Sequence, residues 1–152
     1  MPGEVVISTS EVSGPATTGF DHFAPTASDA EASATWYAEV FGLERLPAKV
    51  AHHGDNSPGH AILLRDPQTN ALVGIHQHEQ SLDGPFDERR PGLDHMAWGV
   101  ASRAELERWA QWLDALQVDH SGITDVSGQR SYSVIVFRDP DNIQLELIAR
   151  SV

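Results

Sequence analysis

The stretch Gly19-Phe20-Asp21-His22-Phe23-Ala24 recurs 73 residues later as Gly92-Leu93-Asp94-His95-Met96-Ala97. The same spacing relates Trp36 to Trp109, and Arg65-Asp66-Pro67 to Arg138-Asp139-Pro140. These matches at one offset indicate two copies of one folding unit, each opening with a strand that carries a histidine. A pseudo-twofold pairing of the units would bring His22 and His95 together, as in a metal site built by a duplicated scaffold.

The composition suits one compact domain. The chain has 152 residues, of which 40% are hydrophobic, and this is enough for a single core. No stretch approaches the roughly 18 apolar residues that span a bilayer. The segment Met1 to Thr18 is small and polar, unlike a secretory signal, and we expect a flexible lead-in. The chain has no cysteine, which excludes disulfides and thiolate ligands and fits a cytoplasmic protein.

The charge disfavours one class of partner. The net charge is −12, whereas binding to nucleic acid requires a basic surface. A cationic small ligand would be attracted, although the same charge also serves solubility. With no cysteine, any metal must be held by nitrogen and oxygen ligands, and eight histidines supply the nitrogen.

Hydrophobic periodicity predicts the same order of elements in both halves: one strand, one helix and three strands. In the first half we expect a helix over Ala30 to Phe41, between the cap candidates Ser28 and Asp29 and the terminating Gly42. In the second half we expect a helix over Ser102 to Gln117. The expected strands are Phe20 to Ala27, Leu43 to Ala51, Gly59 to Arg65, Ala71 to His78, Leu93 to Val100, Asp119 to Val126, Ser131 to Phe137 and Ile143 to Ala149. The expected modules are therefore residues 19–79 and 92–150, joined by a polar linker over residues 80–91.

The chain resembles the vicinal oxygen chelate superfamily, which includes glyoxalase I, extradiol dioxygenases, and fosfomycin- and bleomycin-resistance proteins. The resemblance covers about Gly19 to Arg150. It rests on the paired histidines, on Trp36-Tyr37 and Phe41-Gly42-Leu43, and on Phe137-Arg138-Asp139-Pro140-Asp141-Asn142 before Leu145-Glu146-Leu147. It implies an α+β fold in which two βαβββ modules form a curved, half-open mixed sheet around a central cavity, with the helices outside. It also implies a homodimer that binds a small molecule. The acidic charge and the lack of a long apolar stretch, for their part, predict no nucleic-acid or membrane partner.

The resemblance also implies a set of metal ligands. His22 and His95 match the ligands of the first strands, and Glu146 matches the carboxylate of the last strand. Two imidazoles and one carboxylate suit a divalent iron, manganese, zinc, nickel or cobalt ion and can leave positions open for substrate. Bleomycin-resistance-type members use this fold without a metal. The site can form within one chain or across a dimer, and the sequence does not decide between these arrangements.

The strand Ala71 to His78 has two possible registers. At the constant 73-residue offset, Val73 matches Glu146, and His76 and His78 would be buried under a helix, which is costly for unpaired imidazoles. A shift by one residue reverses the faces, because strand periodicity is two. We favour the shifted register, which requires one extra residue in the turn Gln68-Thr69-Asn70. Gly74 then matches Glu146, and His76 becomes the candidate for a base, a further ligand or a substrate contact.

Two hypotheses with a specific activity follow, beside a third in which the chain is a structural or regulatory module with a degenerate site. The first is a small metal-dependent lyase, isomerase or dioxygenase that chelates substrate oxygens and stabilises an oxyanion, with the metal as Lewis acid. Glyoxalase I activity is disfavoured, because either register lacks the first-module carboxylate of that enzyme. The second is a metal-free protein that sequesters a cationic, aromatic ligand, with Trp98 available for stacking.

Overall fold

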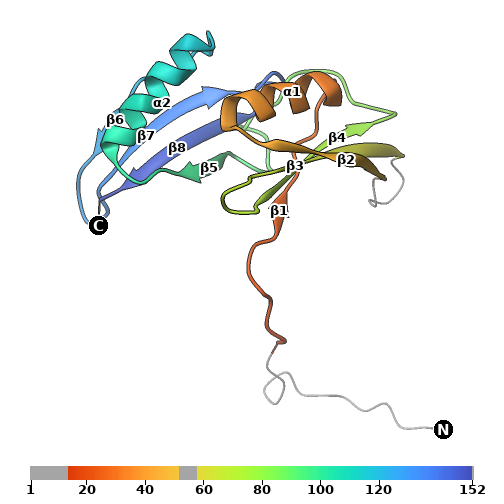
Figure 1. Ribbon diagram of the computed structural model, residues 1–152, viewed down its shortest axis with the longest axis horizontal. Coiled ribbons are helices and arrows are strands. Elements are labelled where there is room, and N and C mark those ends of the chain that lie inside the picture. The colour runs from red at the N-terminus through yellow and green to blue at the C-terminus, as the bar shows by residue number, and fades with distance from the viewer. Residues whose placement is uncertain (1–13, 52–57, 152) are drawn as a thin grey trace, which may run out of the picture.

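The computed structural model describes residues 14–51 and 58–151 (Figure 1). Most of the expected lead-in, and residues 52–57 of the loop expected between the second and third strands, lie outside these ranges. The elements are β1 (His22–Phe23), α1 (Ala30–Phe41), β2 (Glu44–Ala51), β3 (Gly59–Arg65), β4 (Leu72–His78), β5 (Met96–Gly99), α2 (Arg103–Ala115), β6 (Thr124–Val126), β7 (Tyr132–Arg138) and β8 (Gln144–Arg150). Neither described helix is long and apolar enough to cross a membrane.

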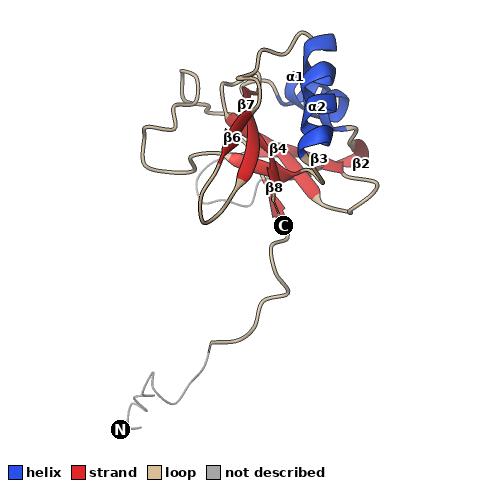
Figure 2. Cartoon of the chain, turned by 90° about the vertical axis from the view of Figure 1, so that its left-hand side faces the viewer, coloured by secondary structure: helices blue, strands red, loops and turns tan. Residues whose placement is uncertain are grey.

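The strands form two four-stranded mixed sheets, in the orders β1-β4-β3-β2 and β5-β8-β7-β6. In each sheet the first strand of the half runs parallel to its last strand, and the other neighbours are antiparallel. Both helices lie on the same side of the strands (Figure 2), and Nε1 of Trp112 in α2 donates to the carbonyl of Val40 in α1 at 3.0 Å. The expected α+β fold with two βαβββ units is confirmed, and the sheets do not close into a barrel.

The helix α1 begins and ends where the local signals predict. The side chain of Asp29 accepts a hydrogen bond from the amide of Ala32 at 3.0 Å, as an N-cap does. Gly42 ends the helix with φ of 66°, a left-handed conformation that glycine adopts without a steric penalty. Ser102 caps α2 in the same way by accepting from the amide of Glu105.

The two opening strands are shorter than expected. Regular pairing in β1 covers only His22–Phe23, because Pro25 has no amide hydrogen to donate. The segment nevertheless stays beside β4, since the amide of Ala27 donates to the carbonyl of His76 and the amide of His76 donates to the carbonyl of Pro25. β5 covers only Met96–Gly99, so His95 stands just before the first regular pair of its strand.

A buried hydrogen bond connects the two halves. The Tyr37 hydroxyl donates to Oδ2 of Asp139 at 2.8 Å, and both side chains are buried. The other carboxylate oxygen of Asp139 accepts from the amides of Asp141 and Ile143. Burial raises the pKa of Asp139, and burial beside this carboxylate raises the pKa of Tyr37 well above its ordinary range. The apolar residues of both helices and both sheets form one core around this link.

Candidate functional site

The second sheet brings two of the expected ligands together. Nε2 of His95 lies 3.5 Å from Oε2 of Glu146, and the two side chains are 40% and 18% exposed. Glu146 stands in β8 opposite Ala97 of β5. Its neighbours Leu145 and Leu147 point to the opposite face of the strand and are fully buried in the core. The alternation of β8 therefore presents Glu146 on the face of the sheet away from the helices.

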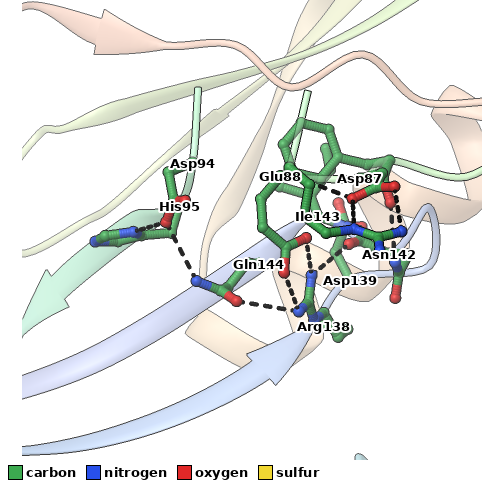
Figure 3. A network of polar contacts seen from close by, with 11 residues as sticks. Asp87, Glu88, Asp94, His95, Arg138, Asp139, Asn142, Ile143 and Gln144 are labelled. Carbon is green, nitrogen blue, oxygen red and sulfur yellow. Dashed lines mark hydrogen bonds and ion pairs between the residues drawn. The ribbon is translucent and has the colours of Figure 1, made fainter. Parts of the chain in front are cut away.

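His95 is fixed at its other ring nitrogen. Nδ1 of His95 lies 2.6 Å from Oδ1 of Asp94, the preceding residue (Figure 3). An ionised carboxylate only accepts hydrogen bonds, so this contact requires a proton on Nδ1. In a neutral imidazole that assignment leaves the lone pair on Nε2, the atom that faces Glu146.

The first module repeats the aspartate–histidine contact. Nδ1 of His22 lies 2.6 Å from Oδ1 of Asp21, and both side chains are largely exposed. His22 is located in β1, at the edge of the first sheet. Within residues 14–51 and 58–151 of one chain, no third histidine, aspartate or glutamate joins His95 and Glu146 in a cluster able to hold a metal.

Pairing of the strands supports the shifted register of β4. Phe23 pairs with Val73, whereas its counterpart Met96 pairs with Leu145, so the offset between the modules falls from 73 to 72 residues. The extra residue lies in the turn after β3. The amide of Asp66 donates to the carbonyl of Ala71, whereas the amide of the matched Asp139 donates to the carbonyl of Ile143, so the first turn is one residue longer. Gly74 therefore stands where Glu146 stands in the second module.

The faces of β4 follow from this register. Val73 and Ile75 are buried against the core, and Gln77 on the same face accepts a hydrogen bond from the amide of Ala30 at 2.9 Å. His76 occupies the opposite face together with Gly74. Its Nε2 lies 3.5 Å from the position that a Cβ atom would take at Gly74. The imidazole of His76 thus covers the place where the first module lacks a carboxylate.

A polar network that the sequence interpretation did not include stands behind His95 (Figure 3). The side-chain amide of Gln144 donates to Oδ1 of Asp94 at 3.4 Å, and its oxygen accepts from Nη2 of Arg138 at 3.0 Å. Arg138 donates two hydrogen bonds, of 2.7 and 2.8 Å, to the carboxylate of Glu88. These bonds lower the pKa of Glu88 to about 2. The one sequence signal for this network was the aspartate that precedes the histidine in both repeats.

Other candidate residues lie elsewhere. Trp98 stacks on Phe41 with ring centroids 4.0 Å apart and forms a T-shaped pair with Phe23, so its ring already has aromatic partners. A cavity of about 350 Å³ lies between the linker and the two opening strands, with Thr26, Leu82, Phe86 and Leu93 among its lining residues. Neither His95 nor Glu146 lines that cavity.

Comparison with known families decides the relationship. The family model of the Glyoxalase/Bleomycin resistance protein/Dioxygenase superfamily matches residues 19–147. The chain belongs to this superfamily. No curated protein matches the sequence.

Solved structures of this superfamily share the fold. A glyoxylase/bleomycin resistance protein/dioxygenase domain from Frankia sp. EAN1pec has 26% sequence identity and a TM-score of 0.71, over 90% of this chain and 94% of that one. A glyoxalase family protein from Enterococcus faecalis has 23% identity and a TM-score of 0.67, over 86% and 97% of the two chains. The fosfomycin resistance protein FosX from Listeria monocytogenes, solved with Mn(II) and sulfate, has 17% identity and a TM-score of 0.61, over 90% and 96%.

Proposed function

We propose that this superfamily member is a metal-dependent enzyme whose metal is held by His95, Glu146 and His22. The observation that carries the proposal is the 3.5 Å approach of Nε2 of His95 to Oε2 of Glu146, with Nδ1 of the same imidazole engaged by Asp94. Metal-binding histidines in proteins are held in this way, with the second ring nitrogen donating to a carboxylate. The pair thus presents one nitrogen and one oxygen ligand at a single point.

The chemistry of the three side chains fits a first-row divalent metal. Two imidazoles and one carboxylate suit iron, manganese, zinc, nickel or cobalt and leave positions for substrate oxygens. A metal held there would act as a Lewis acid toward those oxygens. The Mn(II) of the FosX structure supports manganese as the first ion to test.

We propose that the third ligand comes from a second copy of the chain. In the described residues of one chain, no group of three histidine, aspartate or glutamate side chains could hold a metal, although His22 repeats the His95 motif and its contact with aspartate. His22 also stands on an edge strand, with one side unpaired in the sheet. Phe20 and Leu93, which flank the two histidines at matched positions, are 84% and 57% exposed. A homodimer would cover these apolar side chains and complete the site.

We assign to His76 the role of base or substrate contact in this site. It lies on the same strand face as Gly74, which matches Glu146 by register. Its Nε2 lies 3.5 Å from the position that the Cβ atom of an acidic residue would take at Gly74. A histidine can accept a proton near neutral pH, so it can replace a carboxylate as a base. A glyoxalase I reaction, which depends on the missing carboxylate, is not the reaction we propose.

Metal analysis tests this proposal. Plasma mass spectrometry would be applied to the wild-type protein and to the His95→Ala and His120→Ala variants, before and after incubation with Mn(II) and Fe(II). His120, which follows α2 and contacts Asp114 near the end of that helix, is a control histidine. We expect one metal per chain in the wild type and the His120→Ala variant, and loss of metal in the His95→Ala variant. Equal metal content in all three proteins would overturn the assignment.

A second function, sequestration of a cationic aromatic molecule without catalysis, is favoured by the net charge of −12. Absence of metal from the wild type after reconstitution, together with a thermal shift caused by a cationic drug-like ligand, would support it. Charge alone also serves solubility, so the metal-dependent enzyme remains our primary proposal.

A further inference from the structure

The two histidine motifs differ in what stands opposite them in the neighbouring strand. His22 pairs with Leu72. In the second module Met96 pairs with Leu145, so the residue opposite His95 is Gln144. The sequence therefore places an apolar side chain beside one aspartate–histidine pair and an amide beside the other. Only Gln144 can donate a hydrogen bond to the aspartate, and its amide does so at 3.4 Å from Oδ1 of Asp94.

The amide of Gln144 is itself oriented. Its oxygen accepts from Nη2 of Arg138 at 3.0 Å, and an arginine has no acceptor, so the NH₂ end must face Asp94. Arg138 is held in turn by two hydrogen bonds to Glu88 and by one to the carbonyl of Asn142. Two parallel bonds between a guanidinium and a carboxylate fix both groups in one plane. Every polar group in this series therefore has a set direction (Figure 3).

The matched arginine of the first module has another partner. Arg65 donates to Glu44 at 2.7 Å, and both side chains are about half exposed. Leu72, which stands opposite His22, has no side-chain amide that could orient the carboxylate of Asp21. The side chains of Asp94 and His95 are 63% and 40% exposed, against 83% and 52% for Asp21 and His22. The second motif is thus the more fixed of the two.

We propose that Gln144 is a positioning residue: held by Arg138, it orients Asp94 so that Nδ1 of His95 carries the proton and Nε2 is presented beside Glu146. This inference rests on the proposed function, because the imidazole is prepared for a metal. It assigns different tasks to the two repeats: His95 is preorganised within its own chain, whereas the more exposed His22 is available to a second copy. Preorganised ligands bind more tightly, and loss of such outer partners weakens metal binding by roughly 10- to 100-fold.

The test uses Gln144→Met, which keeps the size of the side chain and removes both polar ends. Its matched control is Glu44→Gln, which weakens the equivalent arginine contact in the first module. Isothermal titration with Mn(II) should show binding about 10-fold weaker for Gln144→Met and unchanged for Glu44→Gln. Asp94→Asn, which removes the accepting carboxylate, should weaken binding at least as much. Binding by Gln144→Met within about twofold of the wild type would overturn the proposal.

A second readout does not depend on the metal. Long-range ¹⁵N–¹H NMR correlations in the metal-free protein report which ring nitrogen of His95 carries the proton. We expect the proton on Nδ1 in the wild type and in Glu44→Gln, and a mixture of the two tautomers in Gln144→Met. An unchanged tautomer in Gln144→Met would overturn the positioning role even if Mn(II) binding fell. If the wild type binds no metal at all, the proposed function fails, and the tautomers still decide the role of Gln144.

Discussion

Gly74 in β4 occupies the register position that Glu146 occupies in β8. The pairing of Phe23 with Val73, and of Met96 with Leu145, fixes this equivalence. A carboxylate therefore stands at this position in the second module, whereas the first module has no side chain there and His76 lies across the gap. The duplicated halves thus differ at this position, and this difference disfavours any mechanism that requires a carboxylate at the matched position of both modules.

Replacement of Gly74 by alanine should leave the protein folded and slightly more stable. A Cβ atom there would meet its nearest neighbours at 3.5 Å, which is ordinary contact. Alanine also loses less backbone entropy than glycine on folding, a gain of about 0.5–1 kcal/mol in the free energy of unfolding. Urea unfolding followed by circular dichroism measures this quantity.

The control for that variant is Gly59→Ala. At Gly59 a Cβ atom would lie 2.2 Å from the backbone carbonyl oxygen of Gln77, so the strand pair must move apart. We expect this variant to lose more than about 1 kcal/mol of stability. Equal stability of the two alanine variants would show that the packing around β4 differs from the one described.

Replacement of Tyr37 by phenylalanine should destabilise the protein by about 1–3 kcal/mol, because it removes a buried hydrogen bond to the carboxylate of Asp139. Tyr132→Phe is the control, since the Tyr132 hydroxyl makes no hydrogen bond within residues 14–51 and 58–151, and it should change stability little. Chemical unfolding at neutral pH compares the two variants. A similar loss in both would show that the link between the halves contributes nothing specific.

The same tyrosine predicts an alkaline limit of stability. The folded protein raises the pKa of Tyr37, first through burial and then through the nearby Asp139, above its ordinary value of 10.0. The contribution of Tyr37 to the free energy of unfolding is therefore complete below about pH 10. It is lost as the pH rises further, because the tyrosine ionises more readily in the unfolded chain than in the folded protein. The wild type should lose stability above pH 10 more steeply than Tyr37→Phe. Parallel stability curves for the two proteins would contradict this assignment.

The contact between Glu88 and Arg138 predicts a loss of stability at acid pH. The bonds from Arg138 lower its pKa from 4.5 to about 2, so its contribution is present above pH 4.5 and is lost as the pH falls toward 2. Glu88→Gln should therefore flatten the dependence of stability on pH in this window. Glu39→Gln, at an exposed position of α1, should leave it unchanged. NMR titration of the Glu88 carboxyl provides a direct check, and a midpoint near 4.5 would mean that the contact with Arg138 is not maintained in solution.

Local signals in the sequence were sufficient to predict much of the fold. Asp29 and Gly42 bound α1 as expected, because capping depends on a few adjacent residues. The shifted register could be predicted because burial of two histidines under a helix is unfavourable, and the strand pairing supports it. Both opening strands were overestimated. In the first, the hydrophobic pattern continues through Pro25, which has no amide hydrogen for regular pairing.

The network behind His95 could not be predicted in the same way. Gln144 and Asp94 are distant in the chain, and their contact depends on which residues stand opposite each other in two parallel strands. Periodicity assigns a side chain to a face but does not identify its cross-strand partner. The repeated aspartate before each histidine is evident in the sequence. That the aspartate contacts Nδ1 of the histidine could be seen only from the positions of the imidazole atoms. The second copy that we propose as the source of the third ligand is likewise not specified by a single sequence.

Mixing two defective variants tests the origin of that ligand. His22→Ala and His95→Ala copies, each with a different affinity tag, would be co-expressed, and the mixed dimers isolated through both tags. If each site takes His22 from one copy and His95 with Glu146 from the other, a mixed dimer retains one intact site. We then expect about half of the wild-type metal content, whereas each variant alone should bind almost none. If each site lies within one chain, both sites in the mixed dimer are broken and no metal is recovered. A wild-type protein that is monomeric by light scattering yet binds one metal per chain would also exclude the shared site.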